Sequence, residues 1–226
     1  MTKKQVEPTT FNGSGDYWEH RYASGRNSGV GSYKKFADFK AGIINPFVET
    51  NNIQTVIEFG CGDGNQLSLS NYHTYTGFDV SKTAIDFCKR KYVDDASKIF
   101  KLANQYNSET ADLSLSLDVL YHLVEDNIFS EYMKNLFNAS KCYVVIYSSN
   151  FDSDPSEWAE HVRHRNFTQW IDKNIPNWTL VERIENEYPY TGNYKTGTPA
   201  DFYIYKSNSK FNHFQLLFKS LLNKLK

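Results

Sequence analysis

The chain has 226 residues, of which 40% are apolar, and this is enough to build one sizeable hydrophobic core. Lysine and arginine number 25 against 26 for aspartate and glutamate. The resulting net charge of −1 argues against a sequence-independent nucleic-acid binder, which needs a dense basic surface. No apolar run is typical of a signal peptide or long enough to span a bilayer. Three cysteines without CxxC spacing predict neither a disulfide framework nor a zinc site, so we expect a cytoplasmic protein with reduced thiols.

Predicted helices and strands alternate along most of the chain. Residues 33–50 carry apolar side chains on one face and predict a helix, and Ser81 is the expected N-cap of a second helix over 81–92. Short apolar runs predict strands at 55–59, 75–78, 99–103, 113–117 and 142–147. A further helix is expected at about 127–139. Because strands alternate with helices, we predict a doubly wound α/β sheet with helices on both faces.

The C-terminal part of the chain breaks this alternation. Residues 167–175 predict one more helix, and strands are expected at 178–188 and 201–207. Their connection is too short for a crossover helix, so the two strands should pair in antiparallel orientation at one edge of the sheet. No repeat or linker is visible, and we predict a single domain over 1–207 and an amphipathic basic helix over 208–226.

The stretch VIEFGCGDGNQL is the most informative part of the sequence. It places an acid, Glu58, near the end of a buried strand and follows it with Gly60, Gly62 and Gly64. Glycines let the backbone turn sharply and approach a ligand without a Cβ in the way. A dinucleotide fold needs glycine at the position of Asn65, so the pattern here is E-x-G-x-G-x-G instead of GxGxxG. Asp79 follows the second strand, where a carboxylate can accept both hydroxyls of a ribose; the alternative is a helix cap.

This pattern resembles the first motif of the class I S-adenosylmethionine (AdoMet) methyltransferases. The resemblance implies a Rossmann-like, seven-stranded sheet with a C-terminal antiparallel hairpin. It also implies that Glu58 organises the turn and helps to receive the methionine ammonium, and that Asp79 holds the ribose. The stretch GDYWEHRYASG resembles an entrance segment in which Tyr17 and Trp18 close over the methionine and Arg21 pairs with its carboxylate. An amphipathic helix that covers the sheet edge is the alternative for this segment.

Two other segments extend the resemblance to the rest of the cofactor. KLANQY follows the third strand, where the family holds the adenine, although a plain exit from the strand is the alternative. SLSLDVLYHL resembles the fourth-strand motif, which lies near the methionine. The cofactor-binding residues implied by the resemblance are Tyr17, Trp18, Arg21, Glu58, Phe59, Gly60, Gly62, Asp79, Val80, Leu102, Asn104, Asp118 and Val119.

Several stretches, among them DVLYHLVED and HVRHRNFTQW, resemble a narrower group of small methyltransferases encoded in bacterial surface-polysaccharide gene clusters. Some of these are associated with the O-methyl phosphoramidate decoration of capsules. We therefore expect O-methylation of a small anionic sugar-linked acceptor, either a sugar phosphate or a phosphoramidate. The alternatives are an N-methyltransferase of an amino sugar and a non-catalytic AdoMet-binding protein.

Two long loops at strand ends are expected to hold the acceptor, 148–166 and 188–200. The first contains a basic cluster that suits an anionic acceptor, with an exposed basic start of a helix as the alternative. The predicted acceptor-binding residues are His161, Arg163, Arg165 and Tyr190. An imidazole can take a proton near neutral pH, so the candidate general bases are His122 and His164, although a core histidine is the alternative for each.

Two further features of the sequence have plain structural explanations. Asp152 and Asp154 lie beside Pro155 and are more simply a solvated turn than metal ligands, so we predict no metal site. Residues 211–226 place apolar side chains at helical spacing with lysines opposite. We expect this segment to dock on its own domain or on a second subunit as a homodimer, with peripheral contact to an anionic membrane as the alternative.

Overall fold

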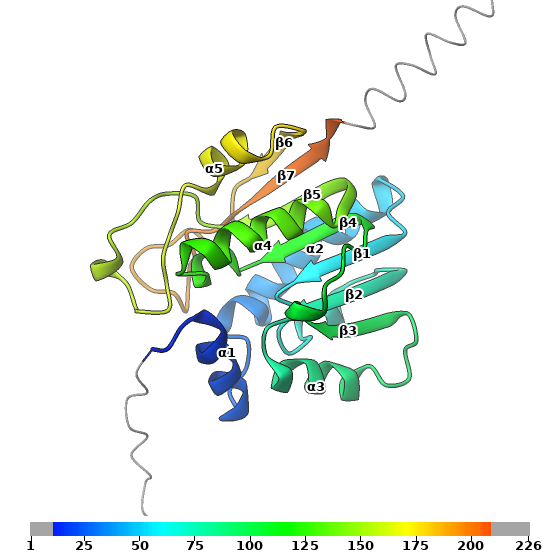
Figure 1. The fold of residues 1–226 in the computed structure, drawn as a ribbon, viewed down its shortest axis with the longest axis horizontal. Coiled ribbons are helices and arrows are strands. Elements are labelled where there is room, and N and C mark those ends of the chain that lie inside the picture. Colours follow the sequence, from blue (N-terminus) through cyan, green and yellow to red (C-terminus); the bar gives the residue numbers. More distant parts are fainter. Residues whose placement is uncertain (1–10, 209–226) are drawn as a thin grey trace, which may run out of the picture.

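One seven-stranded sheet forms the centre of residues 11–208, the part of the chain that the computed structural model describes (Figure 1). The strands are β1 Thr55–Phe59, β2 Thr74–Asp79, β3 Lys98–Leu102, β4 Ala111–Leu117, β5 Ser140–Ser148, β6 Trp178–Ile184 and β7 Asp201–Ser207. Their order in the sheet is β3-β2-β1-β4-β5-β7-β6. The first five strands pair in parallel, and β7 pairs in antiparallel orientation with both β5 and β6. Chain order reverses between β1 and β4, which is where ligands of such sheets bind.

Helices cover both faces of the sheet. They are α1 Ser14–Ala23, α2 Lys34–Thr50, α3 Lys82–Lys91, α4 Asp126–Asn138 and α5 Phe167–Asn174. Side chains of α2 and α3 share one buried apolar cluster with the sheet, and those of α4 and α5 share another. In Figure 1, α4 accordingly lies in front of the sheet and α2 behind it. The predicted α/β sheet with helices on both faces is confirmed.

The central strands show why the sheet is buried on both sides. In β5, Val145 and Tyr147 belong to one apolar cluster, while Val144 and Ile146 belong to the other. A strand that is apolar on both faces is stable only between two layers of helices. The predicted cap of α3 is also confirmed, because the Ser81 hydroxyl accepts a hydrogen bond from the N–H of Ala84 at 3.1 Å.

The C-terminal hairpin is confirmed, but its first strand is shorter than predicted. β6 ends at Ile184, whereas the sequence pattern predicted a strand as far as residue 188. The chain turns at Asn186, whose amide donates to the carbonyls of Tyr188 and Thr198, while its N–H donates to Asp201. These bonds tie the connection together and replace the ladder that a longer strand would need.

The segment 209–226 lies outside the described residues, so its predicted docking role stays a prediction. Within the described residues, none of the helices combines the length and apolar content needed to cross a membrane.

Candidate active site

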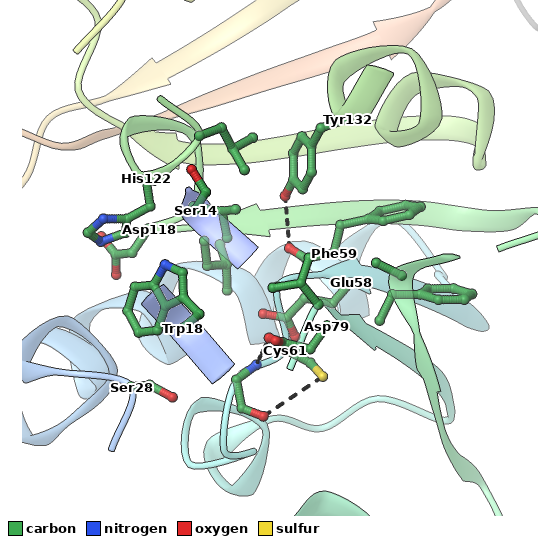
Figure 2. A pocket seen from close by; sticks show the side chains of 18 of the residues that line it. Ser14, Trp18, Ser28, Glu58, Phe59, Cys61, Asp79, Asp118, His122 and Tyr132 are labelled. Atoms are coloured by element: carbon green, nitrogen blue, oxygen red, sulfur yellow. Dashed lines mark hydrogen bonds between the residues drawn. The ribbon is translucent and has the colours of Figure 1, made fainter. Parts of the chain in front are cut away.

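A cavity of about 350 Å³ lies at the carboxyl ends of β1, β2 and β4 (Figure 2). Most of the predicted cofactor residues line it: Trp18, Glu58, Phe59, Gly60, Gly62, Asp79, Val80, Asn104, Asp118 and Val119. The predicted base His122 also lines it. In Figure 2, Asp118 and His122 lie next to each other beside Trp18 of α1, and Glu58 lies beside Asp79. Residues from separate segments of the chain are therefore gathered around one space of a size suited to a small ligand.

The glycine turn after β1 is held by Asp79. One carboxylate oxygen accepts the N–H of Gly62 at 2.9 Å, and the other accepts the N–H of Ser81 at 2.9 Å. Gly60 has φ +84°, and a Cβ there would lie 2.4 Å from a methyl group of Val119, so the turn requires glycine at this position. Asp79 thus joins the first turn to the start of α3, and Ser81 rather than Asp79 is the N-cap of that helix.

The predicted role of Glu58 in organising the turn stays a prediction, because its side-chain hydrogen bond lies within the sheet and not with the turn. Its carboxylate instead accepts a hydrogen bond from the hydroxyl of Tyr75 at 2.7 Å, at the floor of the cavity. Burial raises the pKa of Glu58 to about 7, although the Tyr75 bond and the charge of Lys40 oppose the rise. Burial also raises the pKa of Asp79 to about 6, against the effect of its backbone hydrogen bonds. Two buried carboxyls near neutral pKa favour a ligand that brings positive charge or hydroxyl donors.

Asp118 faces the same cavity in a constrained conformation. Its φ is +62°, which is uncommon for a residue other than glycine. One carboxylate oxygen pairs with the ammonium of Lys40 at 2.5 Å, and the other accepts the hydroxyl of Tyr121 at 2.8 Å. Lys40 lines the cavity but is not among the residues predicted from sequence. The available signal was a lysine on the apolar face of α2, one turn from Phe36 and one turn from Ile44.

His122 lies in a short 3-10 helix, Leu120–His122, with its ring edge against Trp18 at 4.9 Å between centroids. Its Nδ1 lies 3.1 Å from the carbonyl oxygen of His161. A carbonyl can only accept, so this bond assigns the proton of the neutral ring to Nδ1 and leaves Nε2 as an acceptor. Burial lowers the pKa of His122 to about 4, so the ring is neutral at physiological pH. The cavity therefore contains one imidazole lone pair that can accept a proton or a hydrogen bond.

The first helix covers the cavity and is fastened at two places. Ser14, at its start, donates its N–H and its hydroxyl to the carboxylate of Glu125, at 2.8 and 2.5 Å. Glu19, the residue directly after Trp18, accepts the hydroxyls of Ser81 and Thr83 at 2.6 Å each, and the N–H of Thr83 at 3.1 Å. These carboxylates hold α1 over the site, where Ser14 and Trp18 line the cavity.

Three predicted cofactor residues do not line the cavity. The ring of Tyr17 stacks on His161 at 4.1 Å between centroids, outside it. Arg21 donates its Nε–H to the carbonyl of Asn27 at 2.7 Å. Leu102 is partly buried and packs against the apolar core. The predicted pairing of Arg21 with a methionine carboxylate therefore has no support in this arrangement.

The arginines of the predicted basic acceptor site bind the chain itself, and their role toward an acceptor stays a prediction. Arg163 donates to the carbonyl of Val124 at 3.0 Å. Arg165 donates to the carbonyls of Leu123 and Val124 at 2.5 and 2.8 Å, and both guanidiniums pair with Asp126. They fix the segment that leads into α4. His161 likewise lies outside the cavity, with its ring on Tyr17 and its carbonyl on His122.

His164 is a buried core histidine and not a base in the cavity. Its Nδ1 lies 2.5 Å from the hydroxyl of Ser149, and its ring packs against Phe151 and Trp158. Burial lowers the pKa of His164 to about 4. Tyr190 lines a second cavity of about 590 Å³, formed mainly by the loops after β5 and between β6 and β7.

Comparison with known proteins finds a matching family segment and a shared fold. Residues 57–141 match the protein family described as a methyltransferase domain. The N-methyltransferase NodS from Bradyrhizobium japonicum WM9, in complex with S-adenosyl-L-homocysteine (SAH), is 16% identical, covering 87% of this chain and 99% of that chain with a TM-score of 0.67. Magnesium protoporphyrin IX methyltransferase (ChlM) from Synechocystis PCC 6803 is 13% identical, with coverages of 85% and 97% and a TM-score of 0.60. The search of curated proteins finds no match. Because these sequence identities are low, the solved structures show only that the fold is shared.

The sheet topology and the matched segment are similar to those of methyltransferase domains. Such a domain implies S-adenosylmethionine as the cofactor, and the predictions of enzyme class and cofactor are confirmed. The cavity fits this cofactor, since Glu58, Asp79 and Asp118 offer negative charge to a cationic ligand. Among the described residues, the only lysine or arginine that lines the cavity is Lys40, and it is paired with Asp118.

Proposed function

We propose that the protein is an AdoMet-dependent O-methyltransferase that acts in the cytoplasm on a small anionic sugar-linked acceptor, a sugar phosphate or a phosphoramidate. The observation that carries the proposal is the cavity in which Asp79 and the glycine turn lie on one side and the free Nε2 of His122 on another. The part that concerns surface polysaccharides rests on the resemblance of the sequence motifs.

Each end of the cofactor has its own set of residues in this proposal. Asp79 would accept the ribose hydroxyls, and Val80 and Asn104 would contact the adenine side. Glu58 and Asp118 would face the methionine ammonium, beneath Trp18 of α1. When bound, S-adenosylmethionine supplies an electrophilic methyl group on a sulfonium. The main demand on the protein is then to position an acceptor oxygen in line with that group and to exclude water.

His122 would serve an acceptor hydroxyl in this scheme. The carbonyl of His161 keeps the proton on Nδ1, so Nε2 can take a hydrogen bond from the hydroxyl and orient its oxygen. An acceptor that is already an oxyanion needs no base, and His122 would then only contribute to its position. The two cases predict different effects of removing the imidazole on the two kinds of acceptor.

The second cavity supports a sugar-linked acceptor. Phe151, Trp158 and Tyr190 line it, and aromatic rings offer flat apolar faces with polar edges on which a sugar ring can lie. Arg183 lines it too; its guanidinium pairs with Asp201 at 2.6 Å and remains half-exposed, so it can also meet an anionic group. The two loops that form most of this cavity are those in which the sequence predicted the acceptor.

N-methylation of an amino sugar is the second candidate. Two acids, Glu185 and Asp201, line the same cavity and would suit a protonated amine. NodS, whose fold this chain shares, is an N-methyltransferase.

The experiment uses the purified full-length protein with methyl-labelled S-adenosylmethionine and three acceptor panels: sugar phosphates, phosphoramidate-bearing sugars and amino sugars. Mass spectrometry detects the gain of one methyl group, and NMR locates it. We expect a methyl ether or methyl ester of an anionic sugar. A product methylated on nitrogen would replace this proposal by the second candidate, and SAH binding by calorimetry checks the cofactor independently of any acceptor.

A further inference from the structure

Lys40 is a charged residue whose side chain is buried in the fold. Its side chain is 0% exposed, on the apolar face of α2, yet it lines the cofactor cavity. Burying an ammonium group is costly unless the charge is paired. The partner of this ammonium is Asp118, at 2.5 Å, and the ring of Tyr147 lies 5.4 Å away. A hydrophobic residue would fill this position at lower cost, so the charge of Lys40 calls for an explanation beyond packing.

The carboxylate of Asp118 is held from three directions. Lys40 binds one oxygen from α2, and the Tyr121 hydroxyl binds the other from the 3-10 helix after β4. Gly31 closes the third side, because a Cβ there would lie 2.8 Å from the oxygen that Lys40 binds. In this placement the backbone of Asp118 adopts a strained conformation, with φ +62°. Three separate segments thus fix one carboxylate, and its side chain is 13% exposed in the cavity. A carboxylate held in one orientation suits one defined group of a ligand.

The charges that line the cavity indicate which group this is. Glu58, Asp79, Asp118 and Glu131 line it together with one cation, Lys40, among the described residues. Asp79 belongs to the side of the cavity formed by β2 and the start of α3, whereas Asp118 lies beside His122 and Trp18 (Figure 2). An amino-acid end of a ligand, with its α-ammonium group, would complement a fixed carboxylate at this second position.

We propose that Lys40 is a positioning residue for the amino-acid end of the cofactor: it holds the Asp118 carboxylate in the orientation that binds the α-ammonium group. The inference rests on the proposed use of S-adenosylmethionine and adds a residue that acts on it through Asp118. Although Lys40 belongs to the cavity wall, its side chain is 0% exposed and its ammonium pairs with Asp118, so it acts on the ligand through that carboxylate.

The test compares two ligands that differ only in that end. SAH carries the amino-acid group, whereas 5′-methylthioadenosine lacks it and keeps the adenosine. Calorimetry on the full chain measures both dissociation constants for the wild type, Lys40→Met, Asp118→Asn and the double variant. Lys35→Met is the matched control, because Lys35 lies on the same helix and donates to the Thr196 carbonyl without lining the cavity.

We expect Lys40→Met to weaken SAH binding about 10- to 100-fold, the range for a hydrogen bond to a charged group. Binding of 5′-methylthioadenosine should stay unchanged. The double variant should bind SAH no worse than Asp118→Asn, since both changes remove one interaction. Lys35→Met should bind both ligands like the wild type.

Two results would overturn the inference: unchanged SAH binding by Lys40→Met, or an equal loss for both ligands, which indicates a general structural role. If Lys40→Met does not fold, Lys40→Arg replaces it in the test, because arginine keeps the positive charge but displaces the Asp118 carboxylate. This variant should weaken the binding of SAH and leave the binding of 5′-methylthioadenosine unchanged. Failure of the wild type to bind either ligand would instead refute the proposed function.

Discussion

Replacement of Asp79 by asparagine tests the centre of the cofactor site. The carboxylate uses one oxygen for the Gly62 N–H and the other for the Ser81 N–H, both at 2.9 Å. Asparagine has one acceptor oxygen, so one of these donors would lose its partner and face the amide NH₂. The ribose hydroxyls would also lose a charged acceptor.

The expected cost follows from these bonds. A hydrogen bond to a charged group contributes about 1.5–3 kcal/mol, which corresponds to about a 10- to 150-fold weaker dissociation constant for SAH. Calorimetry at about pH 7.5 measures it, where Asp79 with a pKa of about 6 is ionised. The control is Asp86→Asn, which removes an exposed acid of α3 that pairs with Lys82.

The pH dependence provides a second measurement of the same residue. The pKa of Asp79 in the free protein is raised to about 6, so the carboxyl is protonated below that pH and accepts ribose hydroxyls less well. SAH affinity should therefore rise as the pH increases through about 6, by up to tenfold per unit below it, and Asp79→Asn should lack this rise. Glu58, with a pKa of about 7, also titrates here, and Glu58→Gln separates its contribution. An unchanged dissociation constant in folded Asp79→Asn would refute the assigned role.

Three further outcomes follow from the same geometry. His122→Ala should lower kcat for a hydroxyl acceptor by about 10²-fold while SAH affinity stays the same, as measured by steady-state kinetics and calorimetry. Gly60→Ala should destabilise the fold by about 1–3 kcal/mol in thermal unfolding, because of its φ of +84° and the 2.4 Å approach to Val119. Arg165→Met should destabilise the protein by about 1–3 kcal/mol without raising KM for the acceptor, because the Leu123 carbonyl loses its arginine donor and the Val124 carbonyl keeps only Arg163.

Each of these outcomes has a result that contradicts it. Turnover that survives in His122→Ala would place the base elsewhere or make it unnecessary. Gly42→Ala is the control for Gly60, since a Cβ at Gly42 meets nothing within 4 Å and a helix favours alanine. If Arg165→Met raised the KM for the acceptor and left stability unchanged, Arg165 would be assigned to acceptor binding.

The parts of the site that could be predicted from sequence are those made by local patterns. The glycine turn, the acid after β2 and the Ser81 cap are each contained in a few consecutive residues, and they mark strand ends that a parallel sheet brings together. Placement of Trp18, Asn104 and His122 at the cavity followed from the resemblance of longer motifs.

The remaining features depend on pairs of residues that are distant in the sequence. Lys40 and Asp118 are 78 positions apart, and no periodicity in either segment indicates that they meet. The basic cluster in the loop 148–166 predicts a binding site for an anionic acceptor, because its composition suits an anion. Arg163 and Arg165 instead satisfy carbonyls and an acid near residues 123–126, about forty positions away. A sequence gives the charge of a side chain, but its partner is decided by the tertiary fold.

The two acids that fasten α1 have a consequence for turnover. In the proposed site, a nucleoside that leaves on the side covered by α1 requires this helix to separate from Glu125, from the Ser81–Thr83 segment that binds Glu19, or from both. We therefore expect departure of the demethylated product on that side to have its own barrier, set by the separation of α1. Weakening one fastening, for example with Glu19→Gln, would shorten the residence time of the product, whatever the acceptor is.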